Sequence, residues 1–170
     1  AYYGAEPDVK WDGLDYKGAQ VTFRQLRECH FPDKQFDVVT ILDALYYLPD
    51  PDQEMAELAR ILKPGGLMVF DVAGLGYLQL RGMIGGVFGM DRTRTFAAYP
   101  FYHSMRSVSM LLEKAGFAID ARLIDQGIEH SSALLRLAMP AYLMMVKSLS
   151  LVAGSAQELA PKIVCVARRL

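Results

Sequence analysis

The sequence predicts an α/β fold built on a mostly parallel sheet. Residues 36–42 and 67–72 form two apolar runs, and an amphipathic helical pattern lies between them. Two buried strands joined through one helix form a right-handed crossover, so the strands are parallel neighbours. Parallel strands are usually covered on both faces, and we therefore expect helices above and below this sheet.

Composition indicates one globular domain of 170 residues, with 52% hydrophobic and 22% charged residues. A net charge of -1 provides no long-range field for nucleic acid or an anionic membrane, which favours a small, roughly neutral partner. Cys29 and Cys165 are far apart, and Cys165 lies in an apolar run. This arrangement predicts a buried thiol at Cys165 rather than a disulfide framework, and hence a reducing, cytoplasmic setting.

The first elements have recognisable limits. Residues 21–26 alternate as a short strand does, and residues 36–42 read as a buried strand. Asp50 is suited to a helix N-cap, Pro51 to the first helical position and Gln53 to a capping box. The buried stripe of this helix comprises Met55, Leu58, Ala59 and Leu62. Pro64, Gly65 and Gly66 then end the helix before the strand at 67–72.

The second half begins with a long irregular connection at about 73–103. An apolar helical stripe follows from Met105 to Ala115, with Gly116 as its stop, and residues 117–125 and 162–169 read as strands. Between these strands, residues 131–158 form an apolar insertion of one or two helices broken at Pro140. Arg136 and Lys147 interrupt that insertion, so we expect no stable membrane insertion.

One stretch, FPDKQFDVVTILDALYYLPDPDQEMAELARILKPGGLMVFDV at residues 31–72, resembles the middle of class I S-adenosylmethionine-dependent methyltransferases. Their type 11, small-molecule branch is the closest match. Residues 107–125 and 162–169 resemble the family's late helix and its last two strands. The resemblance implies a Rossmann-like seven-stranded sheet with an antiparallel last strand. It also implies S-adenosylmethionine beyond the carboxyl ends of the strands, and methyl transfer to a small-molecule nucleophile.

The resemblance further implies an acidic residue at the end of the second strand, where it accepts hydrogen bonds from the ribose hydroxyls. Glu6 and Asp15 compete for this role. Only five residues separate Asp15 from Val21, too few for a crossover between parallel strands. We prefer Glu6, which closes a short strand at 2–5, and retain Asp15 as the alternative.

The same resemblance implies other cofactor positions. Gln25 and Leu26 occupy the pair that reads adenine, and Leu42 with Asp43 borders the adenine and methionine portions. Tyr47 stands where the family often has a histidine, which leaves that histidine's role open.

His103 is the candidate general base, because it lies in the loop expected over the methyl group and histidine titrates near neutrality. Candidates for the substrate pocket are Tyr77, Arg81 and Tyr102, in or beside the same loop, together with Tyr47. Packing or helix capping is the alternative role for these side chains.

A glycine-rich turn, which the family uses against the methionine end of the cofactor, is missing from residues 1–18. We therefore expect residues 1–170 to be one methyltransferase-like domain that is incomplete at its N-terminus. The alternative is a non-catalytic binding or dimerisation module, with residues 134–152 as a homodimer face. Cys and His at zinc spacing are absent, so we expect no metal.

Overall fold

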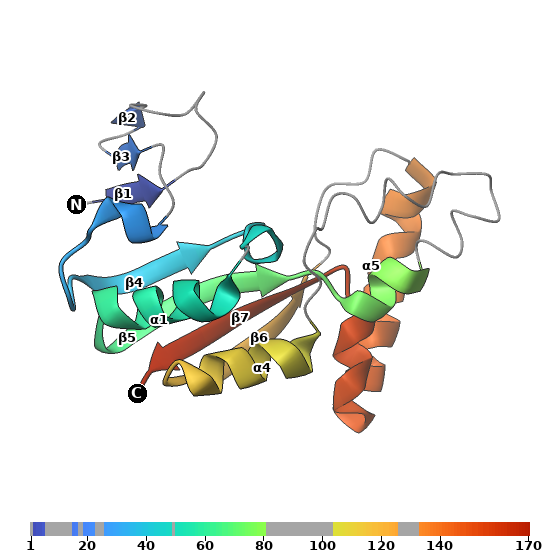
Figure 1. Cartoon of the computed structure of the whole chain (residues 1–170). Coiled ribbons are helices and arrows are strands. Elements are labelled where there is room, and N and C mark those ends of the chain that lie inside the picture. Colours follow the sequence, from blue (N-terminus) through green and yellow to red (C-terminus); the bar gives the residue numbers. More distant parts are fainter. Residues whose placement is uncertain are drawn as a thin grey trace.

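The computed structural model describes residues 2–5, 15–16, 19–22, 26–48, 50–80, 104–125 and 133–170. Figure 1 shows a four-stranded sheet with two helices over one face, and a smaller sheet beside it that contains the N-terminal strands. The larger sheet has the order β4-β5-β7-β6 and comprises β4 (Phe36–Ile41), β5 (Leu62–Val72), β6 (Phe117–Asp125) and β7 (Lys162–Arg169).

Strand directions in the larger sheet match the prediction. β4 pairs with β5 in parallel, and β7 is antiparallel to both β5 and β6. Three strands therefore run one way, and only the last strand of the chain runs against them. As a result, the carboxyl ends of β4 and β5 and the first residue of β7 lie at the same edge.

The smaller sheet has the order β1-β3-β2 and comprises β1 (Tyr2–Ala5), β2 (Asp15–Tyr16) and β3 (Ala19–Thr22). β1 is parallel to β3, whereas β2 is antiparallel to it. The strand predicted at 21–26 is therefore displaced, since β3 ends at Thr22 and the 3-10 helix η2 spans Leu26–Cys29. The resemblance implied a single seven-stranded sheet. The described strands instead form two sheets, because no strand of the smaller sheet pairs with a strand of the larger one.

Helix α1 (Pro51–Ile61) begins as its sequence predicts. The Asp50 carboxylate accepts a hydrogen bond from the backbone N of Gln53 at 3.1 Å, and Pro51 is the first helical residue. The Gln53 side-chain oxygen accepts from Arg27 at 3.0 Å, which joins α1 to η2. The predicted end of the helix is shifted, because Leu62, expected on its buried stripe, already begins β5. β5 then passes through Gly65, whose φ of 77° favours glycine.

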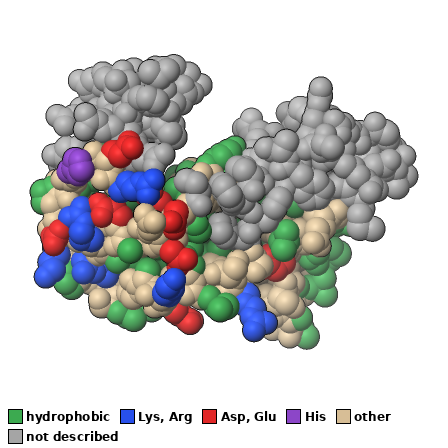
Figure 2. All heavy atoms as spheres, viewed as in Figure 1, with side chains coloured by type: hydrophobic (Ala, Val, Ile, Leu, Met, Phe, Trp, Pro, Cys, Tyr) green, Lys and Arg blue, Asp and Glu red, His purple; other side chains and the backbone are tan. Residues whose placement is uncertain are grey.

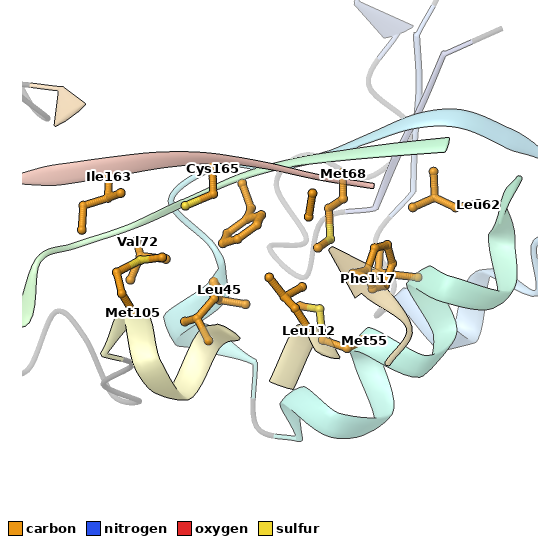
Figure 3. Packing of buried hydrophobic residues seen from close by; sticks show 14 of the residues in the cluster. Leu45, Met55, Leu62, Met68, Val72, Met105, Leu112, Phe117, Ile163 and Cys165 are labelled. Carbon is orange, nitrogen blue, oxygen red and sulfur yellow. The ribbon is translucent and has the colours of Figure 1, made fainter. Parts of the chain in front are cut away.

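The core lies on one side of the larger sheet. α1 and α4 (Met105–Lys114) cover the same face in Figure 1. Figure 3 shows Met55 and Leu112 of these helices directed at Met68 and Cys165 of the strands. The fully buried members of this cluster include Leu58, Ile61, Leu62, Phe70, Val108, Phe117 and Ile163.

The prediction that β4 is covered on both faces is wrong at Val38, which is 51% exposed. Successive side chains of a strand point to opposite faces, and α1 and α4 lie on the same face. Leu123 of β6 is likewise exposed. The apolar run at 36–42 therefore marks a strand that is only partly buried.

The apolar insertion contains α5 (Ala133–Val152), followed by the 3-10 helix η4 (Gly154–Leu159). The predicted break at Pro140 is wrong, because α5 continues through it. Pro140 is exposed, whereas Met139 and Val146 are buried and anchor the helix. In the described part of the chain, no helix is both long enough and apolar enough to cross a membrane.

The connection predicted to be irregular from Ala73 is helical at residues 75–80. The prediction is therefore wrong for this first part. Residues 81–103 lie outside the described residues.

Candidate functional site

The candidate site lies where β4 and β5 end. Leu42 and Asp43 follow β4 directly, and Asp43 has a left-handed backbone with φ 53°. Its backbone N donates a hydrogen bond to Oδ1 of Asp71 in β5 at 2.6 Å. Left-handed backbone is uncommon outside glycine and is best tolerated by Asp and Asn. The hydrogen bond to Asp71 therefore helps to hold Asp43 in this conformation.

Lys162, the first residue of β7, completes the cluster. Its Nζ lies 2.6 Å from Oδ2 of Asp71 and 2.8 Å from the carboxylate of Asp43. Asp71 is only 2% exposed, and a buried carboxylate requires a partner of this kind. Burial lowers the pKa of Lys162, but the hydrogen bonds to Asp43 and Asp71 outweigh it and raise that pKa overall. The ammonium therefore stays charged at neutral pH.

The loop after β4 presents apolar surface beside this cluster. Leu42 is 57% exposed, and Tyr47 at the end of the 3-10 helix η3 (Leu45–Tyr47) is also exposed. Tyr46 packs against the Tyr47 ring at 4.8 Å between ring centroids and donates its hydroxyl to Asp43 at 3.4 Å. Leu45 is buried in the core, so the loop is anchored at its middle.

Leu26, predicted to border adenine, lies in η2 and packs half-buried against the core. The neighbouring Arg27 places its Nε 3.9 Å from Oε1 of Glu54 in α1. Glu54 is 4% exposed, and its second oxygen is buried without a hydrogen bond. Burial raises the pKa of Glu54, although Arg27 opposes this effect.

Tyr77 lies in the helical segment 75–80, beyond the carboxyl end of β5. Its ring centroid is 6.1 Å from that of Tyr142 in α5. The Tyr142 hydroxyl donates to the carbonyl oxygen of Leu159 in η4 at 2.6 Å. Burial, followed by the nearby Tyr77, raises the pKa of Tyr142, so its hydroxyl remains protonated.

The structure brings only some of the predicted site residues together. Leu42, Asp43 and Tyr47 share one loop, Tyr77 follows the neighbouring strand and Leu26 lies in η2. Asp15 lies in β2, which pairs antiparallel with β3 and is thus no crossover strand. Five predicted residues lie outside the described residues: Glu6, Gln25, Arg81, Tyr102 and His103. No group of three or more potential metal ligands occurs among the described side chains.

Sequence reasoning missed Asp71 and Lys162. An acidic residue inside an apolar run that becomes a buried strand is a usable signal, because such a charge requires a partner. That signal would have indicated Asp71. The partner, Lys162, is 91 residues away in the sequence and becomes a neighbour only through the pairing of β5 with β7.

Comparisons with known proteins show a family match over part of the chain and a shared fold over nearly all of it. The methyltransferase domain model matches residues 6–70, which include β4, α1 and all of β5 except its last two residues. The solved structure of an S-adenosylmethionine-dependent methyltransferase from Mesorhizobium loti superposes with a TM-score of 0.60 at 18% identity, over 99% of this chain and 80% of that one. The chain therefore shares the fold of S-adenosylmethionine-dependent methyltransferases, and its residues 6–70 match the methyltransferase domain family. S-adenosylmethionine is the cofactor of this family.

Two relatives are methyltransferases named after quinones. Ubiquinone biosynthesis O-methyltransferase of Pseudomonas entomophila is 41% identical over 58 residues, which is 34% of this chain and 24% of that protein. Demethylmenaquinone methyltransferase of Bacillus licheniformis is 30% identical over 117 residues, 59% of this chain and 50% of that protein. The chain thus spans between about a quarter and a half of the length of these relatives.

Proposed function

We propose that this domain binds S-adenosylmethionine beyond the carboxyl ends of β4 and β5 and transfers its methyl group to a small-molecule nucleophile. The observation that carries the proposal is the Asp43, Asp71 and Lys162 cluster. It fixes the loop after β4 at the edge where ligands bind in open α/β sheets.

The described residues fit part of this cofactor. Leu42 offers an exposed apolar side chain for the flat face of adenine. The cluster contains two carboxylates and one ammonium, so it carries a net charge of -1, which complements a cationic sulfonium. Glu6, with Asp15 as the alternative, remains the candidate for the ribose, and Gln25 with Leu26 for the adenine edge. The turn at 42–50 contains no glycine, so the methionine end requires a glycine-rich turn from elsewhere.

When bound, the cofactor supplies a methyl group already activated by the positive charge on sulfur. The residues of this chain then have two tasks, to orient the acceptor and to exclude water. Tyr47 and Tyr77 are our candidates for orienting the acceptor, together with Arg81 and Tyr102. His103 is our candidate for removing its proton.

The acceptor we propose is a hydroxylated aromatic ring with an apolar substituent. The names of the quinone-biosynthesis relatives support this class. Aromatic side chains near the site support it too, because Tyr47 is exposed and Tyr77 packs on Tyr142. On the face drawn in Figure 2, basic and acidic side chains are interspersed, which does not favour a highly charged acceptor.

The test is transfer of a labelled methyl group. The chain is incubated with S-adenosylmethionine carrying a tritiated methyl group and with a catechol that bears a short alkyl chain. We expect label in the extracted catechol, at a rate that saturates with both compounds. Label that stays with the cofactor, at millimolar catechol and with cofactor binding demonstrated, would rule out this acceptor class.

A second candidate is a non-catalytic module that dimerises through α5. One face of this helix is apolar and between 45% and 90% exposed, and comprises Met144, Met145, Leu149, Leu151 and Val152. Exposed apolar patches of this kind often mark interfaces. This candidate predicts a dimer without cofactor affinity.

Sedimentation equilibrium separates the two candidates. The module predicts a dimer at micromolar concentration that becomes a monomer after Met144→Glu. A monomer at all concentrations, together with cofactor binding, would exclude the module.

We also propose a reducing, cytoplasmic setting. Cys165 is a free thiol. Cys165 is fully buried, and burial raises its pKa to about 11, so it is unreactive at neutral pH.

A further inference from the structure

One carboxylate joins the two ends of the long connection between β5 and α4. Glu158 in η4 accepts a hydrogen bond at Oε2 from the backbone N of Leu75 at 3.1 Å. Its Oε1 accepts from the backbone N of Met105 at 2.5 Å. Leu75 is the first residue of the helical segment 75–80, and Met105 is the first residue of α4. These two amides have no partner within their helices, and a carboxylate also favours the positive end of a helix.

Backbone packing supports the same junction. A Cβ added at Gly74 would lie 2.2 Å from the carbonyl oxygen of Ala160 and 2.5 Å from that of Glu158. At Gly76 it would lie 3.0 Å from the same Glu158 oxygen. The two glycines thus allow the backbone of η4 to approach this segment closely.

We propose that Glu158 is a positioning residue, which holds Tyr77 and the start of α4 in fixed relation at the substrate side of the site. This inference rests on the proposed function, since Tyr77 is a candidate substrate contact. η4 is also tied to α5 through the Tyr142 hydroxyl and the Leu159 carbonyl. Glu158 therefore lies where three helical segments meet. His103, the candidate base, is two residues before Met105 in the sequence.

Only a carboxylate side chain of this length can accept both bonds. A glutamine has the same shape but only one acceptor oxygen, and its amide group would face a second N–H donor. Glu158→Gln should therefore break one of the two hydrogen bonds while keeping the packing. The control is Glu113→Gln, which removes the same charge from an exposed position on α4.

The first measurement is amide hydrogen exchange on the ligand-free full chain. In Glu158→Gln we expect exchange to be faster by about tenfold in residues 75–80, in residues 105–110, or in both, as loss of one hydrogen bond implies. Residues 67–72 of β5 and 163–167 of β7 should be unchanged, as should Glu113→Gln throughout. Unchanged exchange at both helix starts, or equal acceleration across the sheet, would overturn the proposal.

The second measurement asks whether the junction positions substrate. With the alkyl catechol as acceptor, we expect KM for the catechol to rise by about tenfold in Glu158→Gln. The reason is that the substrate side of the site loses the free energy of one hydrogen bond that holds it in place. The dissociation constant of S-adenosylhomocysteine should stay within about twofold. Weakening of both by the same factor would indicate a general structural role and contradict positioning. If the wild-type chain does not methylate the catechol, the acceptor proposal fails, and hydrogen exchange alone decides the role of Glu158.

Discussion

At the scale of single residues, the site depends on the Lys162 ammonium, which Asp43 and Asp71 share. Sequence comparison indicated Leu42 and Asp43, because they directly follow a recognisable strand. It did not indicate that Asp43 is held by Asp71 and Lys162, since that contact requires the register of β5 and β7. Local pattern predicts where a strand ends, whereas the partner of a buried charge depends on tertiary pairing.

Replacing the ammonium tests this cluster. Lys162→Met should lower the free energy of unfolding by about 3 kcal/mol, because it leaves the buried Asp71 carboxylate without a counter-charge. Urea unfolding measures the effect. Adding Asp71→Asn should recover part of the loss, because the unpaired charge is then removed.

Lys63→Met is the matched control. Lys63 pairs with Asp37 at 2.6 Å, but both side chains are exposed, so the expected loss is below about 1 kcal/mol. Equal losses for Lys63→Met and Lys162→Met would show that burial of Asp71 does not determine the energy of the cluster.

Glu54 should make stability depend on pH. Its folded-state pKa is raised by burial above the unfolded value of roughly 4.3, so the folded chain binds this proton more tightly than the unfolded chain. Glu54 is therefore most favourable below the unfolded pKa, and stability is lost as pH rises through the folded pKa. Glu54→Gln cannot ionise and escapes this loss.

The expected result is a stability gain for Glu54→Gln over wild type that increases between pH 4 and pH 7, measured by thermal unfolding at both values. Glu113→Gln, at an exposed position, should show no such trend. A difference between Glu54→Gln and wild type that is the same at pH 4 and pH 7 would contradict the pKa shift.

At the scale of elements, local signals predicted boundaries well. The start of α1 follows from Asp50 and Pro51, and the C-terminal stop of α4 from Gly116, whose φ is 81°. The end of α1 was predicted less well, because Leu62 already belongs to β5. Local signals failed where packing overrides propensity. α5 continues through Pro140 because buried residues on both sides of the proline anchor it. No local pattern indicated that η4 would contact the segment after β5.

Gly74 tests that contact between elements. Gly74→Ala should lower the free energy of unfolding by about 2 kcal/mol, because its Cβ would overlap the backbone oxygens of Glu158 and Ala160, which cannot move independently. Gly154→Ala is the control, since a Cβ there meets nothing within 4 Å. Urea unfolding measures the stability of both variants. Equal free energies of unfolding for Gly74→Ala and Gly154→Ala would contradict close packing of η4 on the segment after β5.

At the scale of the whole molecule, the family and the order of elements from β4 to β7 could be predicted from the sequence. The arrangement of the N-terminal strands could not, because residues 1–25 contain too few local signals to fix strand pairing. One half of the candidate site is thus built from described residues at one sheet edge. The other half, with Glu6, Gln25 and His103, remains a prediction from sequence.

Cofactor binding at the carboxyl end of β4 is the central claim, and isothermal titration of S-adenosylhomocysteine tests it most directly. The matched variants are Leu42→Arg and Met110→Arg, which place the same side chain at two exposed positions, one at the site and one on α4. We predict saturable binding by the wild-type chain, binding at least tenfold weaker by Leu42→Arg because its side chain occupies the adenine surface, and unchanged binding by Met110→Arg. No binding by the wild-type chain at millimolar ligand, or equal binding by both variants, would contradict the claim.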